Sequence, residues 1–389
     1  MILNILVSNN AVNYSKLLFD LTLLMSLPYS TIGFYQIIAA FAGLTNIFKF
    51  GSSSFLVHQY SNKNNDRKKR IFYENVGLYL NINIIVFVLP FFSVFTYIYI
   101  KEFKVYWIIF SFLILIEVHF TNFLELLINA KGKFSLRNKI NYFITLTNLV
   151  FIGLSITTSS LLILERCLVV NVVKIAFFYN IINYRLNWEW YRFGIKNLLL
   201  SSSSYFQSNI YKILNNNIFK IGIGLAAGTH FLGLVAPLLY YQNILVASIG
   251  GVTPYLIKKV HLKNTTELKI YNHYLNKALF LICLTLCFLT YITITILQKQ
   301  TLYSFEWINQ YDYRIFALCI SCFELFKTKK SFYLVTNNFK KANTFEITLL
   351  AIKLLFIISL FLVEFSNSQF FLYYVLNYLI FISVCLVKN

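Results

Sequence analysis

The sequence has few charged residues. Only 12% of its 389 residues are Asp, Glu, Lys or Arg, whereas 58% are hydrophobic and 19% are aromatic. Soluble domains carry about 25% charged residues, so water is not the solvent for most of this surface. A bilayer-spanning helix needs about 20 apolar residues, and a series of such spans uses the whole chain. We therefore expect an all-α polytopic membrane protein with no separate soluble domain.

Cysteine is scarce too, with six residues that all fall in apolar runs. Cys319 and Cys322 have the spacing of a metal-ligand pair, but no second pair or histidine lies near them in the sequence. We interpret the cysteines as small apolar residues and expect no metal, no cofactor and no disulfide framework. No nucleotide-binding loop or nucleophile triad is visible, so we do not expect an enzyme.

Most of the charged residues that are present are basic, and the formal net charge is +20. Most Lys and Arg lie in short connections beside apolar runs, which indicates membrane topology rather than nucleic-acid binding. The first apolar run lacks a basic leader and a small-residue cleavage site, so we expect a retained helix rather than a signal peptide. We place about twelve helices at 5–27, 32–57, 72–99, 103–129, 140–160, 164–183, 198–226, 231–257, 274–297, 312–335, 344–364 and 368–387.

The connections alternate in charge. Those after the second, fourth, sixth, eighth and tenth helices carry most of the basic residues, and the others carry few. Because cytoplasmic loops are enriched in Lys and Arg, these even connections are predicted to be cytoplasmic, as are both termini. A wrong helix count would break this alternation.

The chain also contains an internal repeat at an offset of 200 residues. Gly33 aligns with Gly233, and Gly51 aligns with Gly251. Each copy has the same order of features: a tight turn, a helix with a glycine near its end, and then a basic loop. We expect two pseudo-symmetric six-helix lobes around a central cavity, an arrangement typical of transporters. The predicted boundaries are residues 1–183 for the first lobe, 184–197 for a cytoplasmic linker and 198–389 for the second lobe.

Several short motifs resemble one known family. They are Leu27–Gln36 and Lys49–Ser54 at the two ends of the second helix, Asn129–Lys133, Arg192–Lys196 running into Ser201–Ser204, and Pro254 at the end of the eighth helix. In their order and spacing they resemble the Wzx-type polysaccharide flippases of the multidrug/oligosaccharidyl-lipid/polysaccharide exporter superfamily. The family often has an acidic residue and an arginine midway along helix seven. Here three asparagines and Lys220 occupy that area, which departs from the pattern.

The resemblance implies a substrate and a location. The substrate is an undecaprenyl-diphosphate-linked oligosaccharide repeat unit, moved by alternating access from the cytoplasmic to the periplasmic leaflet of the bacterial inner membrane during O-antigen or capsule assembly. The implied partners are membrane lipids, a polysaccharide polymerase and a chain-length regulator.

Charged residues inside predicted helices are the candidate site residues, because such groups normally face the bundle interior or water. The cationic substrate-binding candidates are Lys16, Lys49, Lys220, Lys327, Lys329 and Lys330. The candidates for ion coupling are Asp20, Glu117 and Glu125. Lys16 and Asp20 are four residues apart on one helix face, so mutual pairing is an alternative. Gly33, Gly51, Gly233, Gly251 and Pro254 are predicted structural turns or close helix approaches.

Two other functions stay open. An ion-coupled exporter of small molecules fits the same fold, although its cavity is expected to be acidic or apolar. A membrane polysaccharide polymerase needs a large periplasmic loop, and the longest one here spans about residues 298–311 and holds only Lys299 and Glu306.

Overall fold

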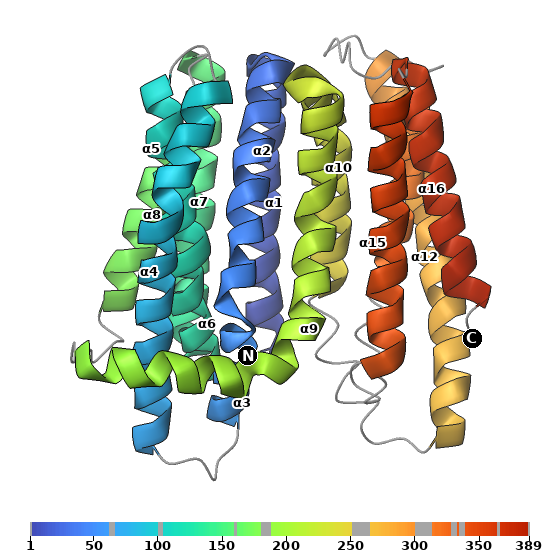
Figure 1. Cartoon of the computed structure of the whole chain (residues 1–389). Helices are drawn as coiled ribbons and strands as arrows, with labels where there is room; N and C mark the ends of the chain where they lie inside the picture. Colours follow the sequence, from blue (N-terminus) through green and yellow to red (C-terminus); the bar gives the residue numbers. More distant parts are fainter. Residues whose placement is uncertain are drawn as a thin grey trace. The chain divides into compact units, whose positions relative to one another are not determined.

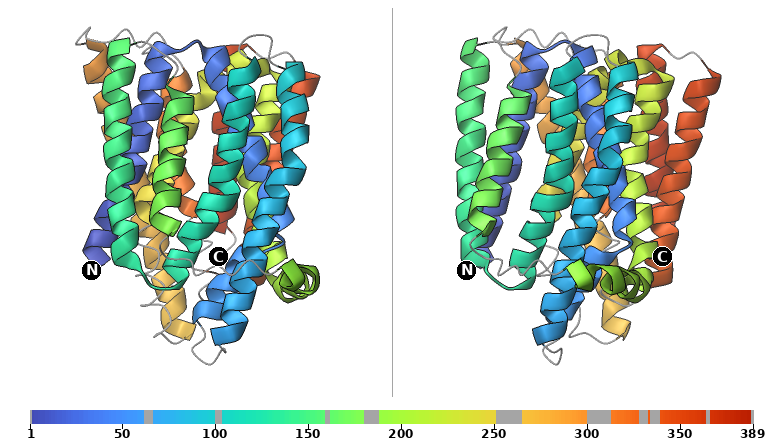
Figure 2. Two further views of the ribbon diagram at one scale, coloured as in Figure 1. Left: turned by 90° about the vertical axis from the view of Figure 1, so that its left-hand side faces the viewer. Right: turned by 60° about the vertical axis from the view of Figure 1, so that its left-hand side comes forward.

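We describe a computed structural model of the chain (Figures 1 and 2). The structure describes residues 2–61, 67–99, 104–158, 162–179, 188–250, 265–299, 313–327, 333, 339–363 and 366–387. Every regular element in these ranges is a helix, which confirms the all-α prediction. Five of the described helices are long and apolar enough to cross a membrane by length and composition.

Contacts divide the chain into two compact units. Unit 1 comprises Met1–Leu27 and Phe34–Ile221, and unit 2 comprises Pro28–Gly33 and Gly222–Asn389. The later division falls inside one helix, α9, and not at the predicted linker over 184–197, so the predicted lobe boundaries stay a prediction.

Unit 1 is a bundle of long helices with a phenylalanine-rich core. Its elements are α1 (Ile2–Ser26), most of α2 (Tyr29–Leu44), η1 (Thr45–Lys49), α3 (Ser52–Ser61), α4 (Arg67–Tyr99), α5 (Lys104–Leu115), η2 (Ile116–Thr121), α6 (Asn122–Ala130), α7 (Phe134–Thr158), α8 (Ile163–Tyr179) and most of α9 (Trp188–Ala226). Helices α1 and α7 lie side by side along their length, and α5 packs against α4 and α8. The first part of α9 lies across the end of α4, where Gly194 contacts Phe72 and Val76 (Figure 1).

Unit 2 contains the remaining described helices. They are α10 (Gly228–Gly250), α12 (Thr265–Lys299), α13 (Tyr313–Ser321), η3 (Cys322–Lys327), α15 (Phe339–Leu362) and α16 (Asn367–Val387). Helix α13 packs against α12 and α16, and η3 packs against α10. Phe326, Phe370 and Phe371 are among its fully buried large side chains.

The predicted second helix is broken near its end. Helix α2 gives way to the 3-10 helix η1, and Phe50 and Gly51 then take positive φ angles of 46° and 78° before α3 begins. Glycine adopts this left-handed conformation without the steric cost of a Cβ, which suits Gly51 to the turn between η1 and α3.

A π-helical segment, η2, lies between α5 and α6. Such segments leave the regular i to i−4 hydrogen-bond ladder. The Lys49 ammonium donates to the Val118 carbonyl of η2 at 3.0 Å, and the Thr45 hydroxyl lies 2.5 Å from Nε2 of His119. Polar groups of η1 therefore supply hydrogen-bond partners to this irregular segment.

The outer helix faces are strongly apolar. Phe87 and Phe91 on α4 are 68% and 65% exposed, Leu281 and Phe288 on α12 are 67% and 64% exposed, and Leu362 on α15 is 78% exposed. Exposed apolar surface of this extent is unfavourable in water but matches the hydrocarbon of a bilayer.

The predicted 200-residue repeat reappears as a reciprocal contact within unit 2. A Cβ on Gly33 would overlap the backbone carbonyl of Thr229, and a Cβ on Gly233 would overlap that of Tyr29. Both pairs are related by the same offset (233 − 33 = 229 − 29 = 200). A two-fold relation between similar segments produces this exchange of identical contacts. The helices therefore approach closely at Gly33 and Gly233.

Candidate functional site

The first candidate site is a buried acid on α1. Asp20 is only 5% exposed, and Lys16, Arg166, Lys220 and Glu117 all interact with it electrostatically. Its Oδ1 has no hydrogen-bond partner among the described residues. A buried carboxylate is costly without compensation, so the nearby cations stabilise it.

A second acid, Glu117, lies in η2 beside the first. The Lys174 ammonium on α8 forms an ion pair with it at 3.6 Å, and Lys16 and Arg166 interact with it electrostatically. The Cys167 thiol lies 3.9 Å from Oε2 of the same carboxylate. Glu117 therefore links η2 to α8 within unit 1.

A hydrogen-bond chain holds Arg166 in position. Its Nε donates to Oδ1 of Asn148 on α7 at 2.8 Å, and the amide of Asn148 donates to the Ser15 hydroxyl on α1 at 2.8 Å. The guanidinium carbon also lies 4.7 Å from the centre of the Phe19 ring, a cation–π contact. Because these contacts connect Arg166 on α8 to two other helices, α7 and α1, the position of the guanidinium is fixed.

Together these residues form what we call the Asp20 cluster. It contains the cations Lys16, Arg166, Lys174 and Lys220 and the acids Asp20 and Glu117. Four positive charges against two negative charges leave an excess of two. A net positive charge of this kind favours an anionic ligand over a cationic one.

Sequence reasoning identified four of these six residues and missed the role of two. Lys16, Asp20, Glu117 and Lys220 were expected site residues. Lys174 and Arg166 were not among the candidate site residues. The signal for Arg166 is its place beside Glu165 and Cys167 at the start of an apolar run, where α8 in fact begins at Ile163.

The other predicted charges of unit 1 lie elsewhere. Lys49 is 8% exposed and is engaged with the Val118 carbonyl. Glu125 on α6 pairs with Arg137 of α7 at 3.6 Å. Neither residue is among the charges that interact with Asp20 or Glu117.

Some predicted residues lie outside the described part of the chain. These are Lys329, Lys330, Gly251 and Pro254. Lys327 ends η3, but its side chain lies outside the description as well. Their proposed roles stay predictions.

Unit 2 has a polar network that sequence reasoning did not assign to a site. Glu324 of η3 is 1% exposed and accepts a hydrogen bond from the Tyr378 hydroxyl of α16. The Gln242 amide of α10 donates to the same hydroxyl at 3.1 Å, and the Tyr374 and Tyr378 rings are 4.8 Å apart. The only sequence signal was an acid within a predicted helix.

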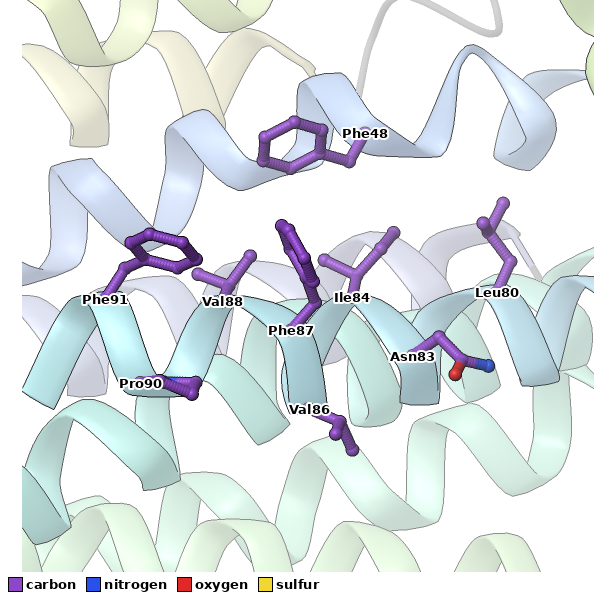
Figure 3. Close-up of a pocket in the computed structure, with 9 residues that line it drawn as sticks. All are labelled: Phe48, Leu80, Asn83, Ile84, Val86, Phe87, Val88, Pro90 and Phe91. Atoms are coloured by element: carbon purple, nitrogen blue, oxygen red, sulfur yellow. The ribbon is translucent and has the colours of Figure 1, made fainter.

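A groove on α4 has a different character. Its volume is about 620 Å³, and Phe48, Leu80, Phe87 and Phe91 are among the side chains that line it (Figure 3). Asn83 is the one polar side chain in the lining, and its amide donates to the Tyr79 carbonyl at 2.8 Å. The groove holds none of the predicted charged site residues, so we do not assign the polar chemistry to it.

Solved structures with similar folds are transporters. An inward-facing multidrug resistance MATE family transporter of the MOP superfamily is 14% identical over 97% of this chain and 93% of its own, with a TM-score of 0.69. The fold of this chain is similar to the fold of that transporter. An outward-facing structure of a MATE family transporter has a TM-score of 0.51 at 13% identity, covering 100% of this chain and 94% of its own.

A further structural neighbour is a MOP superfamily transporter from Pyrococcus furiosus, described as having a binding pocket of reverse polarity that suggests a different function. It is 12% identical over 100% of this chain and 94% of its own, with a TM-score of 0.51. No protein-family model matches the chain, and no curated protein matches it significantly. The similar folds and the apolar helix faces together support a multi-pass membrane protein.

Proposed function

We propose that the protein is a flippase for undecaprenyl-diphosphate-linked oligosaccharide repeat units. It moves them by alternating access from the cytoplasmic to the periplasmic leaflet of the bacterial inner membrane, where both of its termini are cytoplasmic. The units serve O-antigen or capsule assembly, with a polymerase and a chain-length regulator as partners. This is transport and not catalysis, as in the structural neighbours.

The observation that carries the proposal is the excess positive charge of the Asp20 cluster. Arg166 and Lys174 are buried, Lys220 is partly buried and Lys16 is exposed. Among the described residues the cluster sets these four cations against two acids, Asp20 and Glu117. Buried charge is costly, so unneutralised cations in a membrane protein mark a place where an anion is bound. A diphosphate head group supplies the missing negative charge through charge-assisted hydrogen bonds.

The second candidate is an ion-coupled exporter of small molecules. It is favoured by the descriptions of the neighbours as multidrug resistance transporters. The neighbour described as having a pocket of reverse polarity supports the view that one fold serves substrates of different charge. A cationic cluster suits an anionic substrate better than the cationic compounds that an acidic cavity would select.

Deletion of the gene in its host tests the proposal. Surface polysaccharide and the sidedness of the lipid-linked repeat units are measured together. Single units that accumulate in the cytoplasmic leaflet support the flippase. Single units that reach the outer leaflet without polymerising support a polymerase, and an unchanged glycan profile leaves the exporter.

A substitution then tests the cluster. Lys220→Gln removes one cation, and we expect surface glycan output to fall about tenfold, the effect of losing about 1.4 kcal/mol of binding. Lys196→Gln, at an exposed lysine on the same helix α9, is the matched control. If both variants gave equal glycan output at equal protein levels in the membrane, the cluster would have no role in binding the substrate.

A further inference from the structure

The guanidinium of Arg166 uses only part of its hydrogen-bonding capacity. Its Nε donates to Oδ1 of Asn148 at 2.8 Å, and its central carbon lies 4.7 Å from the centre of the Phe19 ring. Among the described residues, its two terminal nitrogens have no hydrogen-bond partner and no carboxylate within 4.0 Å. An arginine with this edge unbonded is suited to binding a phosphate or carboxylate through two parallel hydrogen bonds.

Burial makes the unbonded edge of Arg166 costly. The residue is only 8% exposed, so water solvates little of its charge. Asp20 and Glu117 interact with it electrostatically, but neither forms an ion pair with it. A ligand that carries two acceptor oxygens on one phosphorus or carbon atom satisfies the terminal donors and offsets the charge at the same time.

The direction of the hydrogen bonds determines how Asn148 faces Arg166. The Ser15 hydroxyl of α1 donates to the Val12 carbonyl at 3.0 Å, so its oxygen is left to accept from Asn148 at 2.8 Å. The Asn148 amide therefore presents its nitrogen to Ser15 and its oxygen to Arg166. The contact between α7 and α1 thus sets the orientation of the guanidinium on α8.

A second asparagine–serine contact joins the same two helices. The Asn141 amide of α7 donates to the Ser8 hydroxyl of α1 at 3.4 Å, and that hydroxyl donates to Oδ1 of Asn138 at 2.8 Å. It lies about two helical turns from the first contact (148 − 141 = 15 − 8 = 7), and both contacts are buried. Of the two asparagines, Asn148 is the one that accepts a hydrogen bond from Arg166.

We propose that Arg166 binds the anionic group of the transported substrate through its two terminal nitrogens, and that Asn148 is the positioning residue that orients them. The inference deepens the proposed function and rests on it for the identity of the anion, a phosphate of the diphosphate linkage. The bond to Asn148 and the contact with Phe19 fix the guanidinium before the substrate arrives, so little side-chain freedom is lost on binding.

The test measures the affinity of the purified full-length protein for inorganic diphosphate by titration calorimetry in detergent. Arg166→Lys keeps the charge but loses the paired donors and the bond to Asn148, so we expect about tenfold weaker binding. Asn148→Asp places a carboxylate against the guanidinium and should abolish binding by neutralising it. Asn148→Leu should weaken binding as well, whereas Asn141→Leu, the matched change in the second contact, should not.

Thermal unfolding of the same variants separates binding from folding. Because both asparagines are buried in the same helix contact, the two leucine variants should lose similar stability, yet only Asn148→Leu should lose affinity. If the leucine variants fail to fold, Asn148→Asp against Asn141→Asp gives the same comparison. Equal loss of affinity at the two positions, or full affinity in Arg166→Lys, would overturn the inference.

The outcome is distinguishable from that of the flippase proposal. Diphosphate binding that depends on Arg166, in a protein whose gene deletion leaves surface glycan unchanged, would keep the anion site and reject the flippase. Lipid-linked units that accumulate in the deletion strain, together with an unsubstituted protein that does not bind diphosphate, would reject this inference alone.

Discussion

At the scale of single residues, the pair between Lys174 and Glu117 shows how a membrane helix tolerates charge. The side chains are 8% and 27% exposed, and their charged atoms are 3.6 Å apart. Removing one partner of such a pair leaves the other charge uncompensated, which typically costs about 3 kcal/mol. We expect Lys174→Gln to lower the thermal unfolding temperature of the purified protein by several degrees.

A double substitution separates the pair from its surroundings. In Glu117→Gln/Lys174→Gln both members of the pair are gone, so neither is left without the other, and we expect most of the lost stability to return. Thermal unfolding of the single and double variants in one detergent measures the coupling. Additive losses would mean that Lys174 stabilises the bundle by packing and not through Glu117.

Residue-level partners were the hardest feature to predict. Lys16 and Asp20 are neighbours on α1, so their proximity follows from helical spacing alone. Arg166 and Lys220 approach the same carboxylate from α8 and α9, more than 140 residues further along the chain. No local pattern encodes such an approach, because it depends on how the helices pack.

At the scale of elements, apolar length predicted the helices well and their irregularities poorly. The segment 32–57 was expected to be one helix, yet it divides at η1 and Gly51. The span 103–129 was expected to be regular, yet η2 interrupts it. Lys49 of the first interruption donates a hydrogen bond to the Val118 carbonyl of the second, and hydropathy carries no information about such a bond.

The close approach of α2 and α10 gives a prediction for an element contact. Gly33→Ala or Gly233→Ala places a methyl group where a backbone carbonyl lies, and overpacking of this kind costs about 1–3 kcal/mol. We expect either variant to unfold at a lower temperature than the unsubstituted protein. Because the two contacts are equivalent under the repeat, the two losses should be similar.

Gly153 provides the matched control. It lies within α7, and nothing is within 4 Å of the position its Cβ would take. Gly153→Ala should therefore be neutral or should stabilise the helix by about 0.5–1 kcal/mol. If Gly33→Ala and Gly153→Ala changed the unfolding temperature by the same amount, the close contact at Gly33 would not contribute to stability.

At the scale of the whole molecule, the fold class was easier to predict from the sequence than the residues of the site. The low charge content and the long apolar runs pointed to a polytopic helical protein, and the 200-residue repeat pointed to similar segments that meet at Gly33 and Gly233. Those signals survive because membrane insertion constrains every helix in the same way. The full set of residues in the Asp20 cluster could not be predicted, because the burial of a side chain and its interaction partners depend on how particular helices pack.

The alternating loop charge leads to a prediction about topology. Ser135, at the start of α7, and Ser366, before α16, are both exposed. With cytoplasmic even connections, Ser135 lies on the cytoplasmic side and Ser366 on the periplasmic side.

In intact spheroplasts, a membrane-impermeant maleimide should label Ser366→Cys above the level of the unsubstituted protein but should not label Ser135→Cys. After the cells are opened both should react, which controls for accessibility. Labelling of both from outside would break the alternation and with it the helix count, whereas the opposite pattern would keep the count and place both termini in the periplasm.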